Sequence, residues 1–83
     1  MIVLYFAWVR EQIGVGEEEV APPGDVATVA ALVHWLAARG GGYGEALASP
    51  ERLRAAVDGV FAPLDAPIAC ASEVALFPPV TGG

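Results

Sequence analysis

The residues best suited to chemistry are the last ones, Phe77-Pro78-Pro79-Val80-Thr81-Gly82-Gly83. Pro78 and Pro79 donate no backbone hydrogen bond, so strand pairing should end there and the residues that follow should project from the fold. Gly82 and Gly83 carry no side chain, so a channel too narrow for any other residue could admit the terminal carboxylate. The pattern predicts either a reactive end or a simply frayed terminus.

A terminal carboxyl group has an ordinary pKa of about 3.5 and is therefore an anion at neutral pH. It is a poor electrophile, but it can attack the α-phosphate of ATP and so become activated as an acyl-adenylate. The sequence has no phosphate-binding glycine loop with lysine and no paired nucleophile and base. We therefore expect a separate enzyme to bind ATP and to adenylate Gly83.

Further segments match the pattern of one known family in order and spacing. They are Phe6-Ala7-Trp8-Val9-Arg10-Glu11, Ala55-Ala56-Val57-Asp58, Asp65-Ala66-Pro67-Ile68, Glu73-Val74-Ala75-Leu76-Phe77 and the terminal seven residues. Together they span most of the chain, and the terminal segment is the most specific. On these residues the chain resembles the family of molybdopterin synthase small subunits, which are ubiquitin-like sulfur carriers.

The resemblance implies a function for the chain. An adenylating enzyme of the ubiquitin-activating type would charge Gly83, and a sulfurtransferase or cysteine desulfurase would convert the adenylate to a thiocarboxylate. The large synthase subunit would then use this sulfur to make molybdopterin from cyclic pyranopterin monophosphate. The chain would be the sulfur-donating subunit of a transferase without catalytic side chains or a bound cofactor of its own, and ATP would be used by its partner.

The resemblance also implies which residues meet the partners. An apolar contact patch maps onto Phe6, Phe61 and Phe77, which we expect on three strands of one sheet face. The segment after the patch adds further contacts, from Pro78, Pro79, Val80 and Thr81, and leads to the reactive Gly82 and Gly83. The alternative, that the three phenylalanines fill the core, remains open.

Composition limits the other possibilities. The chain has 83 residues and a formal charge of −6, with one cysteine and one histidine. One small domain follows, without an internal disulfide or the usual ligands of a structural zinc site. The acidity argues against a nucleic-acid partner and either favours a basic protein partner or only maintains solubility. No signal-peptide pattern or membrane-spanning stretch is evident, so we expect a cytoplasmic protein.

The first half predicts a hairpin followed by a helix. Ile2 to Val9 is apolar throughout and indicates a strand with two hydrophobic faces, and Glu17 to Ala21 indicates a charged edge strand rather than a metal site. Thr28 is a suitable N-cap for a helix that should run to about Arg39 and end in the glycines at 40–42. We expect a short second helix from Tyr43 to Ala48.

The second half predicts three strands. Leu53 to Val57 and Val60 to Ala62 should pair across an Asp58-Gly59 turn, and Glu73 to Phe77 should form the last strand. With the resemblance, this order predicts an α+β fold class, a β-grasp (ubiquitin-like) mixed sheet on one main helix. The domain should span residues 1–79, with a flexible reactive tail at residues 80–83. The resemblance implies that the first and last strands lie parallel in the centre of the sheet.

Two features depart from the family pattern, namely Cys70-Ala71-Ser72 before the last strand and the glycine run at 40–42. Cys70 has no neighbouring base or second cysteine, which indicates a structural cysteine rather than a sulfur relay. His34 is likewise expected to face solvent or to pack. Two alternative functions remain, a sulfur carrier for thiazole or another thiolation pathway and a non-reactive ubiquitin-like interaction module.

Overall fold

The computed structural model describes residues 1–79, in which strands and helices alternate at first and three strands close the chain. The elements are β1 (Ile2–Tyr5), α1 (Ala7–Ile13), β2 (Glu17–Glu19), α2 (Val29–Ala37), α3 (Gly41–Ala46), the short 3-10 helix η1 (Pro50–Arg52), β3 (Arg54–Val57), β4 (Val60–Ala62) and β5 (Glu73–Phe77).

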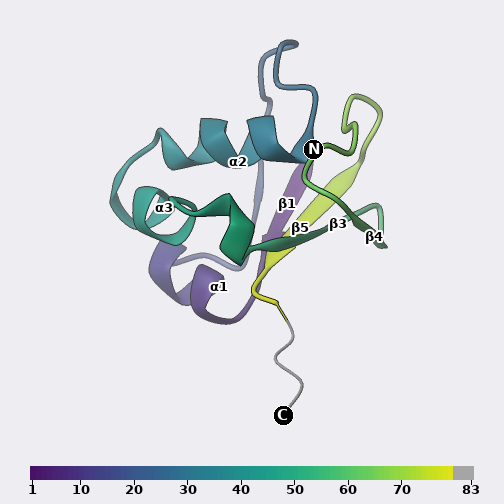
Figure 1. Ribbon diagram of the computed structural model, residues 1–83. Coiled ribbons are helices and arrows are strands. Elements are labelled where there is room, and N and C mark those ends of the chain that lie inside the picture. The colour runs from purple at the N-terminus through teal and green to yellow at the C-terminus, as the bar shows by residue number, and fades with distance from the viewer. Residues whose placement is uncertain (80–83) are drawn as a thin grey trace.

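Within residues 1–79 the strands form one mixed sheet in the order β2-β1-β5-β3-β4. β1 and β5 run parallel, with Ile2 opposite Glu73 and Tyr5 opposite Leu76, and the other neighbours are antiparallel. β5 is therefore the central strand, between β1 and β3 (Figure 1). The expected parallel pairing of the first and last strands is confirmed, and so is the place of β2 at an edge.

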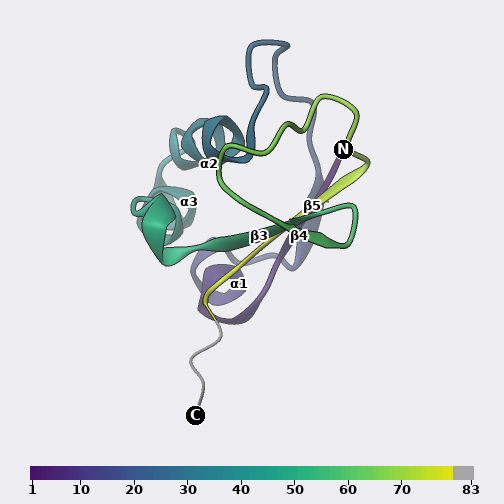
Figure 2. The ribbon, with the colours of Figure 1, turned by 45° about the vertical axis from the view of Figure 1, so that its right-hand side comes forward.

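The helices lie on one side of this sheet (Figures 1 and 2). The side chains that are fully buried between the two layers come from alternate sheet positions and from one stripe of α2. They are Val3, Tyr5, Val74 and Leu76 from the sheet and Val29, Leu32, Val33 and Leu36 from the helix. The helical spacing of the second group is what predicted α2, because such a stripe must face a core.

The first strand is shorter than predicted. It ends at Tyr5, and Ala7, at φ 53°, turns the chain into α1 rather than extending the strand to Val9. Val9 is fully buried in the core from α1. An apolar run of eight residues cannot distinguish a strand from a strand that leads into a buried helix, because both bury the same residue types.

The glycine run has a structural cause. Gly40 (φ 77°) and Gly41 (φ 54°) have the left-handed backbone that favours glycine, and they start α3. A Cβ on Gly42 would lie 1.9 Å from the carbonyl oxygen of Gln12 in α1. The glycines therefore allow α3 to pack closely on α1, and they do not form the left-handed cap of α2, which ends at Ala37 with Ala38 in the right-handed region.

Other local predictions hold in part: the short second helix forms, but it spans Gly41–Ala46 rather than Tyr43 to Ala48, and β3 begins at Arg54 rather than Leu53. The Thr28 hydroxyl accepts a hydrogen bond from the Ala31 backbone N–H at 3.1 Å and caps α2. β3 and β4 pair across Asp58 (φ 49°) and Gly59 (φ 84°), as expected of a tight Asp-Gly hairpin. The Asp58 carboxylate also accepts hydrogen bonds, both of 2.9 Å, from the backbone N–H groups of Ser72 and Glu73, so the turn holds the start of β5 in place.

Candidate functional site

The sheet face opposite the helices carries an apolar row, and the charged residues Glu17, Glu19, Glu73 and Arg54 share this face with it. Leu4, Ala75, Ala56 and Phe61 pair in register and form one row across four neighbouring strands. Phe61 keeps 80% of its surface exposed, although it is the largest side chain of the row. Such a row on an uncovered face is typical of an interaction surface, because isolated domains rarely expose contiguous apolar area without use.

Phe61 and Phe77 define the edge of this face. Their ring centroids lie 5.8 Å apart at an interplanar angle of 50°, a favourable aromatic pair. Beside them is an open groove of about 360 Å³. It is lined by Arg54, Ala55, Phe61, Ala62, Pro63 and Phe77.

Phe6 does not lie on a strand, contrary to prediction. It is the N-cap residue of α1, but its backbone is still extended (φ −132°, ψ 157°) and its N–H donates to the carbonyl oxygen of Leu76 at 3.3 Å. Because strand side chains alternate, Phe6 continues the outward row of Ile2 and Leu4. It is 46% exposed, so it shares the outer face with Phe61 and Phe77, and the alternative of a core role is wrong for Phe6 and Phe61.

After Phe77, the described part of the terminal segment comprises Pro78 and Pro79, which are half-buried and follow β5 directly. β5 ends at Phe77, as the prolines predicted. Val80, Thr81, Gly82 and Gly83 lie outside the described residues. The outer face and the point where the chain leaves β5 thus adjoin at Phe77.

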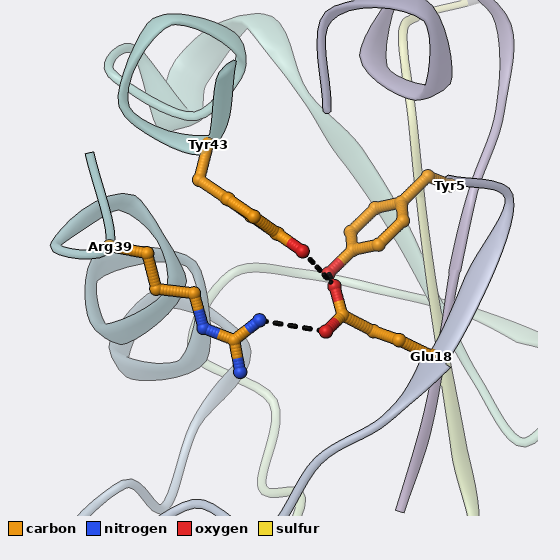
Figure 3. Close-up of polar contacts among 4 residues, drawn as sticks. All are labelled: Tyr5, Glu18, Arg39 and Tyr43. Carbon is orange, nitrogen blue, oxygen red and sulfur yellow. Dashed lines mark hydrogen bonds and ion pairs between the residues drawn. The ribbon is translucent and has the colours of Figure 1, made fainter. Parts of the chain in front are cut away.

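The sequence did not predict a polar cluster at the opposite edge of the sheet, which Figure 3 shows. One oxygen of Glu18 accepts hydrogen bonds from the hydroxyls of Tyr5 (2.9 Å) and Tyr43 (2.5 Å). The other oxygen accepts one from Arg39 at 2.7 Å, which also forms an ion pair. The register places Glu18 beside Val3 on the inner face, so the cluster connects β2 to the helical layer. The sequence could have predicted this, because side chains alternate along a strand and Glu18, between Glu17 and Glu19, must point to the opposite face from its two neighbours.

The electrostatics of this cluster indicate a structural role. Burial acts to raise the pKa of Glu18, but hydrogen bonds from Tyr43, Arg39 and Tyr5 outweigh it and lower the pKa below its usual range. Burial and the bond to Glu18 raise the pKa of Tyr5. The carboxylate is therefore charged and the hydroxyl neutral at neutral pH, and neither is prepared for proton transfer.

Cys70 and His34 are both exposed. Cys70 lies in the loop before Glu73, whereas the terminal segment follows Phe77, so the length of β5 separates the two. Five strand residues span roughly 16 Å, too far for a thiol to reach the emerging chain directly. In the part of the chain that the structure describes, no group of three or more His, Cys, Asp or Glu could hold a metal ion.

The class of protein follows from the sheet order and the parallel β1–β5 pair, which define a ubiquitin-like β-grasp fold. The crystal structure of SAMP1 from Haloferax volcanii is similar to this chain, with a TM-score of 0.72 and 32% sequence identity. The match covers 100% of this chain and 98% of SAMP1.

The ThiS family model matches residues 3–83, so the chain belongs to the ThiS family. Two relatives are each named molybdopterin synthase sulfur carrier subunit. The one from Escherichia coli (strain K12) is 44% identical and the one from Haemophilus influenzae is 38% identical. In each case the match covers 98% of this chain and 96% of the relative.

Proposed function

We propose that this chain is the sulfur carrier subunit of a molybdopterin synthase and that Gly83 carries the sulfur. The observation that supports this most directly is the extent of the match. The family model includes the terminal diglycine, and two relatives named as such carriers are similar over almost the whole chain.

The proposed chemistry takes place on the terminal carboxylate. The carboxylate attacks the α-phosphate of ATP on an adenylating enzyme of the ubiquitin-activating type, and pyrophosphate leaves. A persulfide on a sulfurtransferase or cysteine desulfurase then attacks the adenylate and displaces AMP, and a thiol reductant cleaves the resulting acyl disulfide to leave a thiocarboxylate. The large synthase subunit transfers that sulfur to cyclic pyranopterin monophosphate. Gly82 keeps the approach to Gly83 narrow, because neither residue has a side chain to obstruct a channel.

The folded domain contributes recognition to this process. Three large apolar side chains, Phe6, Phe61 and Phe77, lie on the uncovered side of the sheet, and Pro78 and Pro79 lead away from it. Burying the largely exposed Phe61 ring contributes up to roughly 1.5–3 kcal/mol, and Phe6 and Phe77, which are already partly buried, contribute less. These gains favour a complex in which a partner sits on the outer face.

The proposal places the chain in the cytoplasm, without a nucleic-acid or membrane partner. An acidic chain of formal charge −6 does not favour nucleic acid. No helix within residues 1–79 is long and apolar enough to cross a membrane. We place the chain in the cytoplasm, where ATP and the pterin precursor are available.

Two other functions use the same surface. A carrier for thiazole synthesis or another thiolation pathway would be charged in the same way, and the names of the two curated relatives favour the molybdopterin pathway over it. A non-reactive interaction module would use the exposed face of Phe61 and Phe77 but would never react at its end.

The test is to add one alanine after Gly83. The extension moves the carboxylate by roughly 3.5 Å, and a displacement of about 1 Å can already cost on the order of a hundredfold in rate. We expect sulfur transfer to be abolished, while thermal stability and affinity for the large subunit change little. The assays are pyrophosphate release with the cognate adenylating enzyme, intact mass for the thiocarboxylate, and molybdopterin formation with the large subunit.

Each alternative has its own outcome. Native-rate sulfur donation by the extended chain would show that the diglycine is not the active group. A native chain that binds partners but releases no pyrophosphate would be an interaction module. A native thiocarboxylate that the large subunit cannot use would point to another thiolation pathway.

A further inference from the structure

This acidic chain has few positive charges, and they differ in their partners. The sequence has four arginines and no lysine against ten acidic residues. Arg39 pairs with Glu18 inside the polar cluster. Arg54, in contrast, lies at the start of β3, directly opposite Phe77 in the antiparallel register, and lines the groove beside Phe61.

Backbone carbonyl oxygens orient the Arg54 guanidinium. Its Nη1 donates to the carbonyl oxygens of Leu53 (2.8 Å) and Glu51 (3.3 Å). No carboxylate of residues 1–79 forms an ion pair with it. A guanidinium has five N–H donors, so several remain for another molecule. Backbone carbonyls that hold part of the group reduce the entropy lost when the rest binds.

Arg52 adds a second charge close by. Its guanidinium carbon lies 5.2 Å from the centre of the Trp8 ring, so the side chain rests on α1. Arg52 is exposed and only two residues before Arg54. Arg52 and Arg54 thus place two positive charges next to the single acidic residue Glu51 at the start of β3, on a protein whose net charge is negative.

A partner that covers this groove must match both its apolar rings and its positive charge. The rings of Phe61 and Phe77 require apolar contact, and Arg54 requires an anion, because a cation that loses water without a counter-charge is costly. A carboxylate matches the planar fork of a guanidinium through two parallel hydrogen bonds, which a carbonyl oxygen cannot do.

We propose that the groove beside Phe61 and Phe77 binds a segment of the large synthase subunit in which an apolar side chain lies next to an aspartate or glutamate, with that carboxylate on Arg54. The inference rests on the proposed function. It assigns the large subunit because Phe61 and Phe77 of the contact patch proposed for that subunit line the groove, and because β5 ends at Phe77.

The test compares two variants that each lower the net charge by one unit. Arg54→Gln removes the proposed contact, whereas Ala69→Glu adds a negative charge at an exposed position in the loop before β5, away from the groove. Affinity for the purified large subunit is measured by calorimetry at several salt concentrations. We expect Arg54→Gln to weaken binding about tenfold and to reduce its salt dependence, with little effect of Ala69→Glu.

The partner side chain is then identified. Each acidic residue of the large subunit that lies near the small-subunit contact is changed to its amide, in combination with Arg54→Gln. One of them should be non-additive with Arg54→Gln, because the two changes remove the same ion pair. Arg54→Lys should recover only part of the affinity, since lysine keeps the charge but not the planar fork.

Three results would overturn the inference while leaving the sulfur carrier function intact, provided the native chain still donates sulfur. In the first, Arg54→Gln and Ala69→Glu lose the same affinity for the large subunit. In the second, Arg54→Gln binds the large subunit with native affinity. In the third, Arg54→Gln weakens binding to the adenylating enzyme but not to the large subunit. Failure of the native chain to bind the large subunit would instead refute the proposed function, and the inference with it.

Discussion

Both faces of the sheet carry large apolar side chains, but these side chains have different surroundings on the two faces. The inner face presents Val3, Tyr5, Val74 and Leu76, all almost completely buried under the helices. The outer face presents Leu4, Phe61 and Phe77 among charged residues such as Glu17, Glu73 and Arg54, and no helix within residues 1–79 covers it (Figure 2). Hydrophobicity therefore does not separate stability from recognition in this protein. The difference lies in what covers each face.

The two edges of the sheet show the same division. At the β2 edge, Glu18 is connected to Tyr5, Arg39 and Tyr43, so that edge is joined to the helical layer. At the β4 edge, Val60 and Phe61 keep 68% and 80% of their surface exposed. A charged edge protects a sheet against unwanted pairing, whereas an apolar edge is retained only where a partner covers it. The comparison can be tested from both sides.

The largest effect on stability is expected where the helical cover is tightest. Gly42→Ala would place a Cβ 1.9 Å from the Gln12 carbonyl oxygen and force α3 away from α1. Overpacking against backbone should cost about 2–3 kcal/mol in the free energy of unfolding, measured by urea denaturation. Gly44→Ala, in the same helix, is the control, because its Cβ would meet its nearest neighbour, the Ala37 carbonyl oxygen, at 3.5 Å. Equal destabilisation by the two changes would contradict the close α1–α3 contact.

The next effect should appear mainly in binding. Phe61→Ala removes a largely exposed ring and its contact with Phe77, so the free energy of unfolding should fall by only about 0.5–1 kcal/mol. Affinity for the large subunit should fall about tenfold, since a buried aromatic anchor is lost. Val60→Ala is the matched control from the same strand, because Val60 pairs with Val57 and points to the other face. If Val60→Ala weakens binding as much as Phe61→Ala, the outer face is not the recognition surface.

The smallest effect is expected at the polar cluster, and it depends on pH. Glu18→Gln should cost about 1 kcal/mol at neutral pH, because charged hydrogen bonds to a partly exposed carboxylate are lost. The pKa of Glu18 is lowered in the folded state, so its contribution is present above the ordinary glutamate pKa and disappears as pH falls through the folded value.

Urea denaturation of both chains between about pH 7 and pH 3 checks this expectation. The stability of the native chain should approach that of Glu18→Gln at the acid end. Glu19→Gln, on the exposed side of the same strand, should behave like the native chain throughout. Parallel pH profiles for the native chain and Glu18→Gln would show that the cluster does not contribute through its charge.

Local chemistry determined much of the structure directly from the sequence. Thr28 predicted a helix start, Asp58-Gly59 predicted a hairpin, and Pro78-Pro79 predicted the end of β5. Each of these signals acts through the residue's own backbone preference or its immediate neighbours, so it needs no knowledge of the rest of the fold. The terminal diglycine and its family pattern belong to the same kind of information.

Tertiary structure decided which apolar surface is covered, and that choice depends on residues far apart in sequence. The run from Ile2 to Val9 is uniformly apolar, yet only packing divides it into β1, the outward Phe6 and a helix that buries Val9. Glu18 differs from Glu17 and Glu19 only because its strand register points it toward Tyr5 and Tyr43. Arg54 lies beside Phe77 only because β3 and β5 are neighbours. Burial and strand pairing depend on which distant residues become neighbours in the fold, so they cannot be predicted from a residue's type alone.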